Sequence, residues 1–329
     1  MRGLAAFLAS LALTLGSATA LGTPSLWQRA KDPKVARDDA LLRRVERRLG
    51  QLELLGSVSS AIDPELVREL TLGVTTMAEL DSRASADPRL DYLLGGALVD
   101  VDAGREAEAR RLLERALARA PDSPLAAAGL FQLSIAAAKL GDHVTERAAC
   151  VRALERTWDD DIRANLYVNL AETDMFDGDL PRAIREYHSA LASSGRPDAV
   201  AMAYFGLAVA LDRSGDLPSA LDAAAQALAI RLPPALFVVP SALDLPGVFY
   251  TPGYEIHYYK ALAAMAVARG TKDPPARRDA LADAAEHWAS YLAAAEPDHA
   301  RWVEQARLHQ SSVERELVAL SQRPKKASK

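Results

Sequence analysis

Apolar residues in the middle of the chain recur at the three- and four-residue spacings of an α-helix. Leu166 and Leu170, for example, fall on one such helical face. Gly178 then interrupts the pattern, and Asp179 can cap a following helix through its side-chain oxygen. The apolar spacing resumes after Pro181, a residue that the first turn of a helix tolerates. The pattern predicts a helical hairpin, in which two antiparallel helices are joined at Gly178.

The same pattern returns every 37 residues. In each cycle a glycine marks the turn, and an alanine–leucine pair begins twelve positions later. The glycines are Gly104, Gly141, Gly178 and Gly215, and the pairs begin at Ala116, Ala153, Ala190 and Ala227. Two features that stay in phase over four cycles indicate one supersecondary unit repeated along the chain. Because alanine and leucine dominate while aromatic residues make up only 6%, we expect an all-α protein.

The placement of small residues in each cycle resembles the tetratricopeptide repeat (TPR). The third cycle has the small, turn, alanine, aromatic and alanine positions of that family in order, at Ala171, Gly178, Ala183, Tyr187 and Ala190. The second cycle departs most, with Ser134 and Glu146 at two positions that are usually alanine. The family period is about 34 residues, so the extra residues are expected in the turns between repeats. The resemblance covers roughly residues 90 to 234.

This resemblance implies a right-handed α-solenoid of TPR-like helical hairpins, with flanking N-terminal helices and a C-terminal capping helix. The expected organisation, in chain order, is a signal peptide (1–20), an N-terminal helical segment (21–88), four repeats of period 37 (89–234), an insertion rich in proline and aromatic residues (235–253), a degenerate fifth hairpin (254–296), a capping helix (297–321) and a disordered basic tail (322–329). The helices expected outside the repeats are Ala36–Leu55, Pro64–Ser82, Tyr254–Arg269, Arg277–Ala295 and His299–Leu320.

In tetratricopeptide superhelices the first helix of each hairpin lines a concave groove, and the resemblance therefore names candidate partner-binding residues. They form two neighbouring and mostly apolar stripes: Leu94, Phe131, Val168 and Phe205 in one, and Leu98, Ile135, Glu172 and Val209 in the other. A groove that clamps the carboxylate end of a peptide needs basic and amide side chains, and only Lys139 and Arg213 come near these positions. We therefore expect an apolar helix or strand in the groove, from a partner or from this chain itself.

The segment between Leu232 and Tyr259 breaks the alanine-rich pattern with five prolines and a concentration of aromatic residues. Its prolines exclude a long helix, and a loop of this length without regular structure is uncommon unless it has a function. Two interpretations stay open: the segment folds back on the solenoid, or it forms a recognition surface. The candidate recognition residues are Phe237, Phe249, Tyr250, Tyr254 and Tyr258.

The first twenty residues have the features of an export signal. Arg2 is followed by an apolar run from Leu4 to Leu15, and Ala18 and Ala20 supply the small residues that a signal peptidase needs. The run is shorter than the roughly 20 residues of a membrane-spanning helix. We therefore expect cleavage after Ala20, export to the periplasm and no stable membrane span afterwards. Cys150 is the only cysteine, so it can form no intramolecular disulfide, and it falls at a core position of the repeat.

A search for catalytic or ligand-binding chemistry finds no motif. The six histidines form no metal-binding pair at helical spacing, and no phosphate-binding glycine loop or nucleophile elbow is present. The net charge of −5 gives no reason to expect nucleic acid as a partner. The arginine cluster between Arg43 and Arg48 is either a solvated helix face or a docking site for an anionic partner. We expect no metal, no cofactor and no enzymatic activity.

Taken together, these features favour a non-catalytic scaffold or adaptor outside the cytoplasm that binds a protein or peptide segment on its apolar groove. An alternative is a small-molecule-binding solenoid for uptake or sensing, with its pocket under the aromatic insertion. The sequence leaves the partner and the oligomeric state open.

Overall fold

The computed structural model describes residues 37–45, 47, 76, 87–100, 104–193, 196–232, 241–245, 248–297 and 300–322. The signal peptide, almost all of the expected helix Pro64–Ser82, Phe237 of the insertion and most of the basic tail lie outside these residues. Within the described part, every regular element is helical, as the sequence predicts. The chain divides into two compact units: residues 1–158 with 234–238 form unit 1, and residues 159–233 with 239–329 form unit 2.

In its described residues, unit 1 contains two helical hairpins. The first consists of α5 (Pro88–Asp100) and α6 (Glu106–Arg119), and the second of α7 (Ala126–Lys139) and α8 (His143–Leu154). The helices of each hairpin pack against each other, and α7 also packs against both helices of the first hairpin. Cys150 is fully buried on α8, as its position in the repeat predicts. Residues 37–45, in the expected first N-terminal helix, are helical as well.

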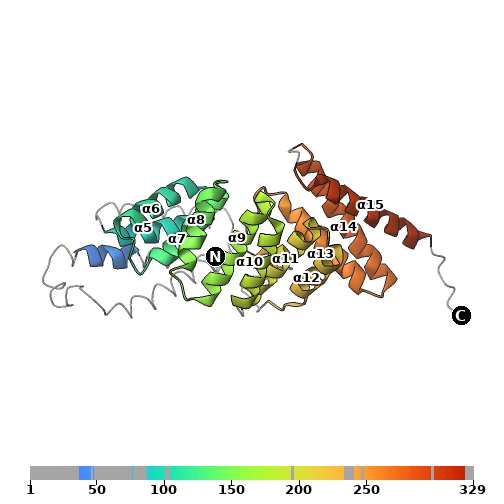
Figure 1. The fold of residues 1–329 in the computed structure, drawn as a ribbon, viewed down its shortest axis with the longest axis horizontal. Helices are drawn as coiled ribbons and strands as arrows, with labels where there is room; N and C mark the ends of the chain where they lie inside the picture. Colours follow the sequence, from blue (N-terminus) through green and yellow to red (C-terminus); the bar gives the residue numbers. More distant parts are fainter. Residues whose placement is uncertain are drawn as a thin grey trace. The chain divides into compact units, whose positions relative to one another are not determined.

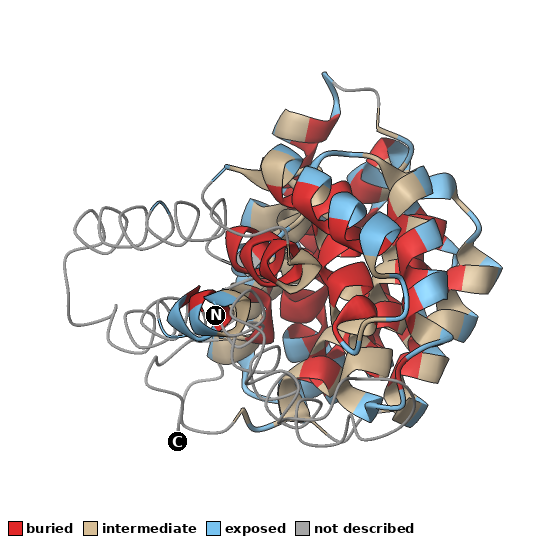
Figure 2. Ribbon diagram, turned by 90° about the vertical axis from the view of Figure 1, so that its left-hand side faces the viewer, coloured by how far each residue is buried: buried red, intermediate tan, exposed pale blue. Residues whose placement is uncertain are grey.

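Unit 2 continues the alternation with three further hairpins. Its helices are α9 (Asp160–Asp177), α10 (Leu180–Ser193), α11 (Pro197–Arg213), α12 (Leu217–Ala229), α13 (Glu255–Gly270), α14 (Pro274–Ala295) and α15 (Val303–Ser321), with a short 3₁₀ helix η2 (Ala242–Asp244) before α13. Successive helices from α9 to α15 pack against one another, and α11 contacts both α9 and α13 (Figure 1). The buried residues lie on the helix faces that are turned toward each other (Figure 2).

Four repeated glycines, three of them followed by an aspartate, explain why the first four hairpins turn where they do. Gly104, Gly141, Gly178 and Gly215 all have positive φ, between 66° and 93°, a conformation that residues with a Cβ adopt only under strain. The aspartate that follows three of these glycines then caps the next helix: Asp142 accepts a hydrogen bond from the Thr145 amide at 3.0 Å, and Asp216 accepts one from the Ser219 amide at 3.1 Å. The 37-residue period is therefore the spacing between successive hairpin turns.

Small residues allow the helices of neighbouring hairpins to approach closely. Gly206 on α11 faces the ring of Tyr187 on α10, and a methyl group at this glycine would overlap the ring. Tyr187 itself is fully buried, at the aromatic position that the family resemblance assigns to the second helix. Packing of a large side chain against a backbone without a Cβ therefore joins the third hairpin to the fourth.

Candidate functional site

The expected groove residues of unit 1 differ in how far they are covered. Leu94 and Leu98 on α5 are 2% and 0% exposed, so they belong to the core. Phe131 and Ile135 on α7 are only half-buried. These two residues are four positions apart and therefore lie on one face of the helix. In unit 1 the candidate surface is thus reduced from four residues to Phe131 and Ile135.

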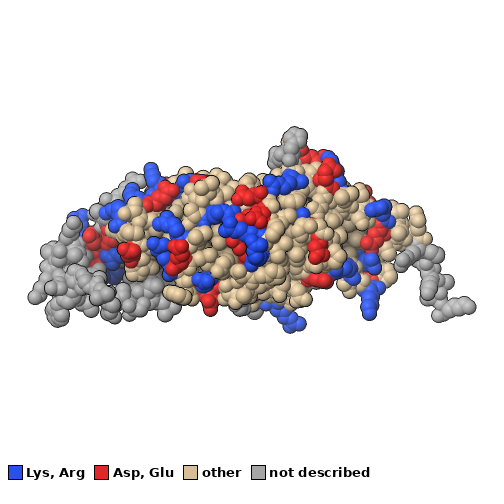
Figure 3. Space-filling view, in the orientation of Figure 1, with Lys and Arg blue, Asp and Glu red and all other residues tan. Residues whose placement is uncertain are grey.

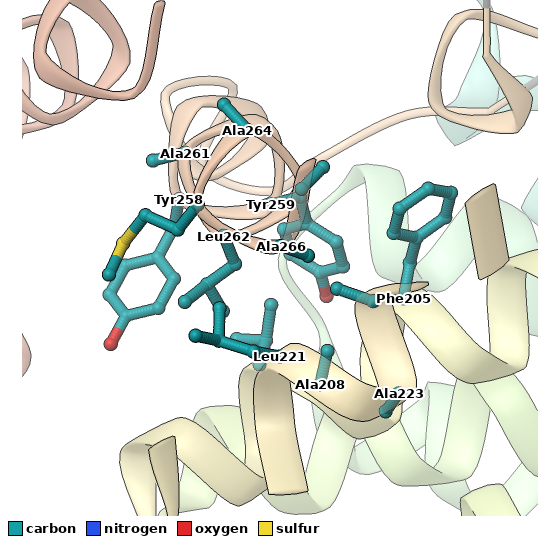
Figure 4. Packing of buried hydrophobic residues seen from close by; sticks show 14 of the residues in the cluster. Phe205, Ala208, Leu221, Ala223, Tyr258, Tyr259, Ala261, Leu262, Ala264 and Ala266 are labelled. Carbon is teal, nitrogen blue, oxygen red and sulfur yellow. The ribbon is translucent and has the colours of Figure 1, made fainter. Parts of the chain in front are cut away.

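Two of the four equivalent residues of unit 2, Phe205 and Val209, are covered by the chain itself. Phe205 and Val209 on α11 are 2% and 0% exposed, whereas Val168 on α9 is half-buried. The helices η2 and α13 pack against α11, and Figure 4 shows Tyr259 of α13 beside Phe205. Phe131 and Phe205 hold equivalent positions in one predicted stripe, but in this structure Phe205 has almost no surface left for a partner.

Glu172, the one charged residue in the apolar stripes, is tied to two tyrosines. Its Oε1 atom accepts hydrogen bonds from the hydroxyls of Tyr187 at 2.5 Å and Tyr259 at 2.7 Å. Burial raises the pKa of Glu172, although the two hydrogen bonds and the nearby Arg213 oppose this shift. Glu172 therefore joins α9 to α10 and to α13, and its carboxylate has protein partners already.

Arg213, at the C-terminal end of α11, lies between aromatic rings. Its guanidinium is 4.7 Å from the ring centroid of Tyr258 and 5.3 Å from that of Trp302, and it forms an ion pair with Glu255. Burial alone would lower the pKa of Arg213, but the Glu255 carboxylate and the surrounding tyrosines raise it, so this side chain stays charged. The cation that the sequence analysis noted near the groove is therefore neutralised within unit 2.

The neighbouring Asp212 is fully buried and accepts hydrogen bonds from two other helices. The hydroxyl of Tyr258 on α13 lies 2.5 Å from its Oδ2, and Nε2 of His309 on α15 lies 2.9 Å from its Oδ1. The side-chain amide of Gln305, also on α15, donates to the main-chain oxygen of Asp212. Asp212 and Arg213 thus form a polar centre where α11, α13 and α15 meet.

This polar centre has residue types that occur in catalytic relays, but its geometry does not suit catalysis. The ring of Trp288 lies 5.2 Å from that of His309, and His309 is 8% exposed. A substrate would have no access to the His309 nitrogen that contacts Asp212. Among the described residues, no group of three or more potential metal ligands comes together.

The described part of the insertion packs onto unit 2. The ring centroids of Tyr250 and Tyr259 lie 5.3 Å apart in an edge-to-face arrangement. The Tyr250 hydroxyl donates a hydrogen bond to the Leu243 carbonyl at 3.4 Å. Lys260 on α13 forms an ion pair with Asp244 of η2 at 2.7 Å. Of the other candidate recognition residues in the described part, Tyr258 is buried, Tyr254 is half-buried and Phe249 is 38% exposed. These contacts agree with the interpretation that the segment folds back on its own helices.

The structure brings together two histidines that the sequence analysis treats as scattered. His257 on α13 and His287 on α14 face each other with their Nδ1 atoms 3.2 Å apart and their ring centroids 5.4 Å apart. One Nδ1–H therefore donates a hydrogen bond to the other Nδ1, which must carry no proton. Burial lowers the pKa of His257, as do His287 and Lys260. A search for spacing within one helix cannot find such a pair, because it forms between the two helices of a hairpin.

No helix in the described part of the chain is long and apolar enough to cross a membrane. On the face of the molecule shown in Figure 3, positive and negative side chains are interspersed, without an extended area of one sign.

Comparisons with known proteins agree with the repeat pattern and the hairpins. One tetratricopeptide-repeat family model matches residues 94–161, and a second matches residues 162–232. Residues 94–232 therefore carry tetratricopeptide repeats. No curated protein matches it.

Several solved helical-repeat structures are similar to the chain at low identity. BtubC (BKLC) from P. vanneervenii is 18% identical, with 73% of this chain and 98% of that chain covered and a TM-score of 0.45. The C-terminal part of a TPR repeat-containing protein from Cytophaga hutchinsonii is 13% identical, with 78% and 93% covered and a TM-score of 0.42. TM-scores in this range support no statement about what this chain binds.

Proposed function

We propose that the chain is a non-catalytic scaffold outside the cytoplasm that binds an apolar segment of a partner protein on the first helices of its hairpins. The observation that supports this most directly is the difference between two equivalent positions. Phe205 is covered by the chain's own helices, whereas Phe131 and Ile135 leave apolar surface exposed on one face of α7. The surface that α13 and η2 cover at Phe205 is therefore partly open at the equivalent Phe131.

The chemistry of this surface decides the class of partner. Phe131 and Ile135 offer dispersion contacts and burial, and complete burial of such a side chain contributes on the order of 1.5 to 3 kcal/mol. Since both are already half-buried, each can add only part of that amount. A partner segment must therefore bring several apolar side chains at helical or strand spacing.

Photocrosslinking from unit 1 tests the proposed surface. A photoreactive phenylalanine analogue replaces Phe131 in the full chain, and adducts formed in cells of the source organism are identified by mass spectrometry. The matched control places the same analogue at Val144, which is 82% exposed on the second helix of the same hairpin. We expect a protein adduct from position 131 that position 144 does not give. The same adduct from both positions, or from position 144 alone, would refute the assignment of the first helices.

The proposed location rests on the N-terminal sequence, with its positive start, apolar run and Ala18–Ala20 cleavage site. Fractionation of cells that produce the full chain with a C-terminal tag, followed by intact-mass measurement, tests it. A periplasmic protein whose first residue is Leu21 is the expected result. A full-length chain found in the cytoplasm would contradict the proposed location but leave the proposed binding surface standing.

The small-molecule alternative stays a prediction and gains no specific support. It places a pocket under the aromatic insertion, where Tyr250 and Tyr259 pack ring against ring and Tyr250 reaches Leu243.

A further inference from the structure

The N-terminal half of α15 contacts helices that are distant in the order of repeats. In a solenoid each repeat is expected to contact only its neighbours. The residues of α15 follow the fifth hairpin, α13–α14, yet Gln305 and His309 bind Asp212 on α11, in the fourth hairpin. Arg301, just before α15, lies so close to Gly178 in the third hairpin that a methyl group there would overlap its guanidinium. α15 packs against α14 as well, and these contacts with earlier hairpins are made in addition.

The side chains of α15 that make these contacts follow the spacing of a helix bound in a groove. Trp302 stands over Arg213, Gln305 donates to the Asp212 carbonyl, and His309 meets the Asp212 carboxylate. Their positions are i, i+3 and i+7, which is the spacing of the anchor residues of helical ligands. Between and beyond them, Ala306 and Val313 are 0% and 2% exposed. One continuous face of α15 is therefore anchored.

The surface that binds this face of α15 is polar, and polar groups favour reversible binding. We call it the acceptor surface: Asp212 and Arg213 of α11 with Tyr258 of α13. Its carboxylate, guanidinium and hydroxyl groups can be hydrated when α15 leaves, so that exposing them is less unfavourable than exposing an equally large apolar core. Beside it, Val303, Ala306 and Val313 of α15 join the hydrophobic core of unit 2.

We propose that the acceptor surface is a recognition site for an amphipathic helix and that α15 is its intramolecular ligand. The helix it fits has an aromatic residue at i, an amide at i+3 and a ring nitrogen or other hydrogen-bond donor at i+7, with small or branched apolar residues between them. While α15 is bound, a partner helix of this chemistry is excluded. The proposal rests on the proposed function in one respect, that first helices carry the recognition surfaces.

A labelled peptide tests the proposal on the full chain. The probe is a fluorescein-labelled peptide of residues 300–322, and its binding is followed by fluorescence anisotropy. In the double variant Gln305→Ala with His309→Ala, α15 loses its polar anchors but the acceptor surface is intact. We expect this variant to bind the peptide about tenfold or more tightly than the wild-type chain, because the bonds of His309 to the Asp212 carboxylate and of Gln305 to the Asp212 main-chain oxygen hold the wild-type α15 in place. Addition of Asp212→Asn to the double variant should abolish this increase in affinity for the peptide.

The matched control is Glu316→Gln, which removes the ion pair between Glu316 on α15 and Arg277 on α14, outside the acceptor surface. This variant should bind the peptide as weakly as the wild type. Equal binding by the wild type and the double variant, or no binding by either, would overturn the proposal.

Hydrogen exchange of the wild-type chain tests whether α15 is a detachable ligand or a permanent capping helix. It requires no variant, so it does not depend on whether a variant folds. We expect amides of residues 303–313 to exchange through local opening at least about tenfold faster than those of α11 and α13. Exchange of all three helices at one rate would show that α15 is part of a single cooperative core and would overturn the proposal. If crosslinking from position 131 fails while the peptide binds as expected, only the proposed surface in unit 1 is lost.

Discussion

Phe131 and Phe205 show how residues at equivalent repeat positions acquire different roles. Both lie on the first helix of a hairpin, but Phe205 is 2% exposed and Phe131 is half-buried. Phe205→Ala should lower the free energy of unfolding by about 3 to 5 kcal/mol, since it leaves a cavity in the core. Phe131→Ala should lower it much less. Urea unfolding of the two variants checks this difference, and equal losses of stability would show that Phe131 is also a core residue.

The carboxyl groups of Glu186 on α10 and Asp174 on α9 are close enough for one to affect the ionisation of the other. Burial and the hydrogen bond and charge of Asp174 raise the pKa of Glu186 from 4.5 to about 7, and Arg182 only partly opposes them. The folded state therefore binds a proton that the unfolded state releases above pH 4.5, and stability is lost as the pH rises toward 7. Glu186→Gln should weaken this loss. Melting temperatures of the wild type and of Glu186→Gln between pH 5 and 8 test this prediction. Parallel curves of melting temperature against pH would contradict the raised pKa of Glu186.

At the scale of elements, the hairpin of α13 and α14 carries a pH-dependent contact. The pKa of His257 is lowered in the folded state, so the unfolded chain binds protons more readily, and this hairpin loses stability as the pH falls through 6.5 and below. His257→Asn should reduce the loss of stability between pH 7 and pH 5. His188→Asn, at an exposed position on α10, provides the control and should leave the pH dependence unchanged. If His188→Asn reduced this loss of stability more than His257→Asn did, the contact between the rings would not be its cause.

The turns offer a second test at this scale. Gly215 has a φ of +93° with no atom near the site of a Cβ, so Gly215→Ala introduces backbone strain and no clash. We expect it to lower the free energy of unfolding by about 1 to 2 kcal/mol. Gly270, the last residue of α13, also has open space around it but no positive φ, and Gly270→Ala should be neutral or slightly stabilising. Equal effects of Gly215→Ala and Gly270→Ala on thermal unfolding would contradict the explanation of the 37-residue period.

Much of this element structure could be predicted because its causes are local. The turn glycines and the capping aspartates act within a few residues, and the expected helix Tyr254–Arg269 differs by one residue at each end from α13. The next helix begins at Pro274 rather than the expected Arg277, since two prolines at its start fit the first turn. The capping helix begins at Val303, four residues later than expected. Helix ends that depend on distant packing are harder to predict than turns.

At the scale of the whole molecule, periodicity identifies apolar faces but does not determine what covers them. The bond between Tyr259 and Glu172 joins residues 87 apart, and that between His309 and Asp212 joins residues 97 apart. Nothing in the local sequence around Phe205 distinguishes it from Phe131, because the covering residues belong to η2 and α13. For this reason the candidate groove was predicted as eight equivalent residues, and only the packing of each unit shows which of them are exposed. The two histidines of the α13–α14 hairpin were missed for the same reason.

The contact between Trp288 and His309 has a practical consequence for spectroscopy. The indole of Trp288 is fully buried, its Nε1–H donates to the Met265 sulfur at 3.3 Å, and the imidazole of α15 stacks beside it. Departure of α15 would remove that imidazole and admit water to the indole, which shifts its emission to longer wavelength. With Trp27 and Trp158, the latter 91% exposed in unit 1, replaced by phenylalanine, Trp288 and Trp302 are the tryptophans left, and their intrinsic fluorescence becomes an unlabelled optical signal for how often α15 detaches.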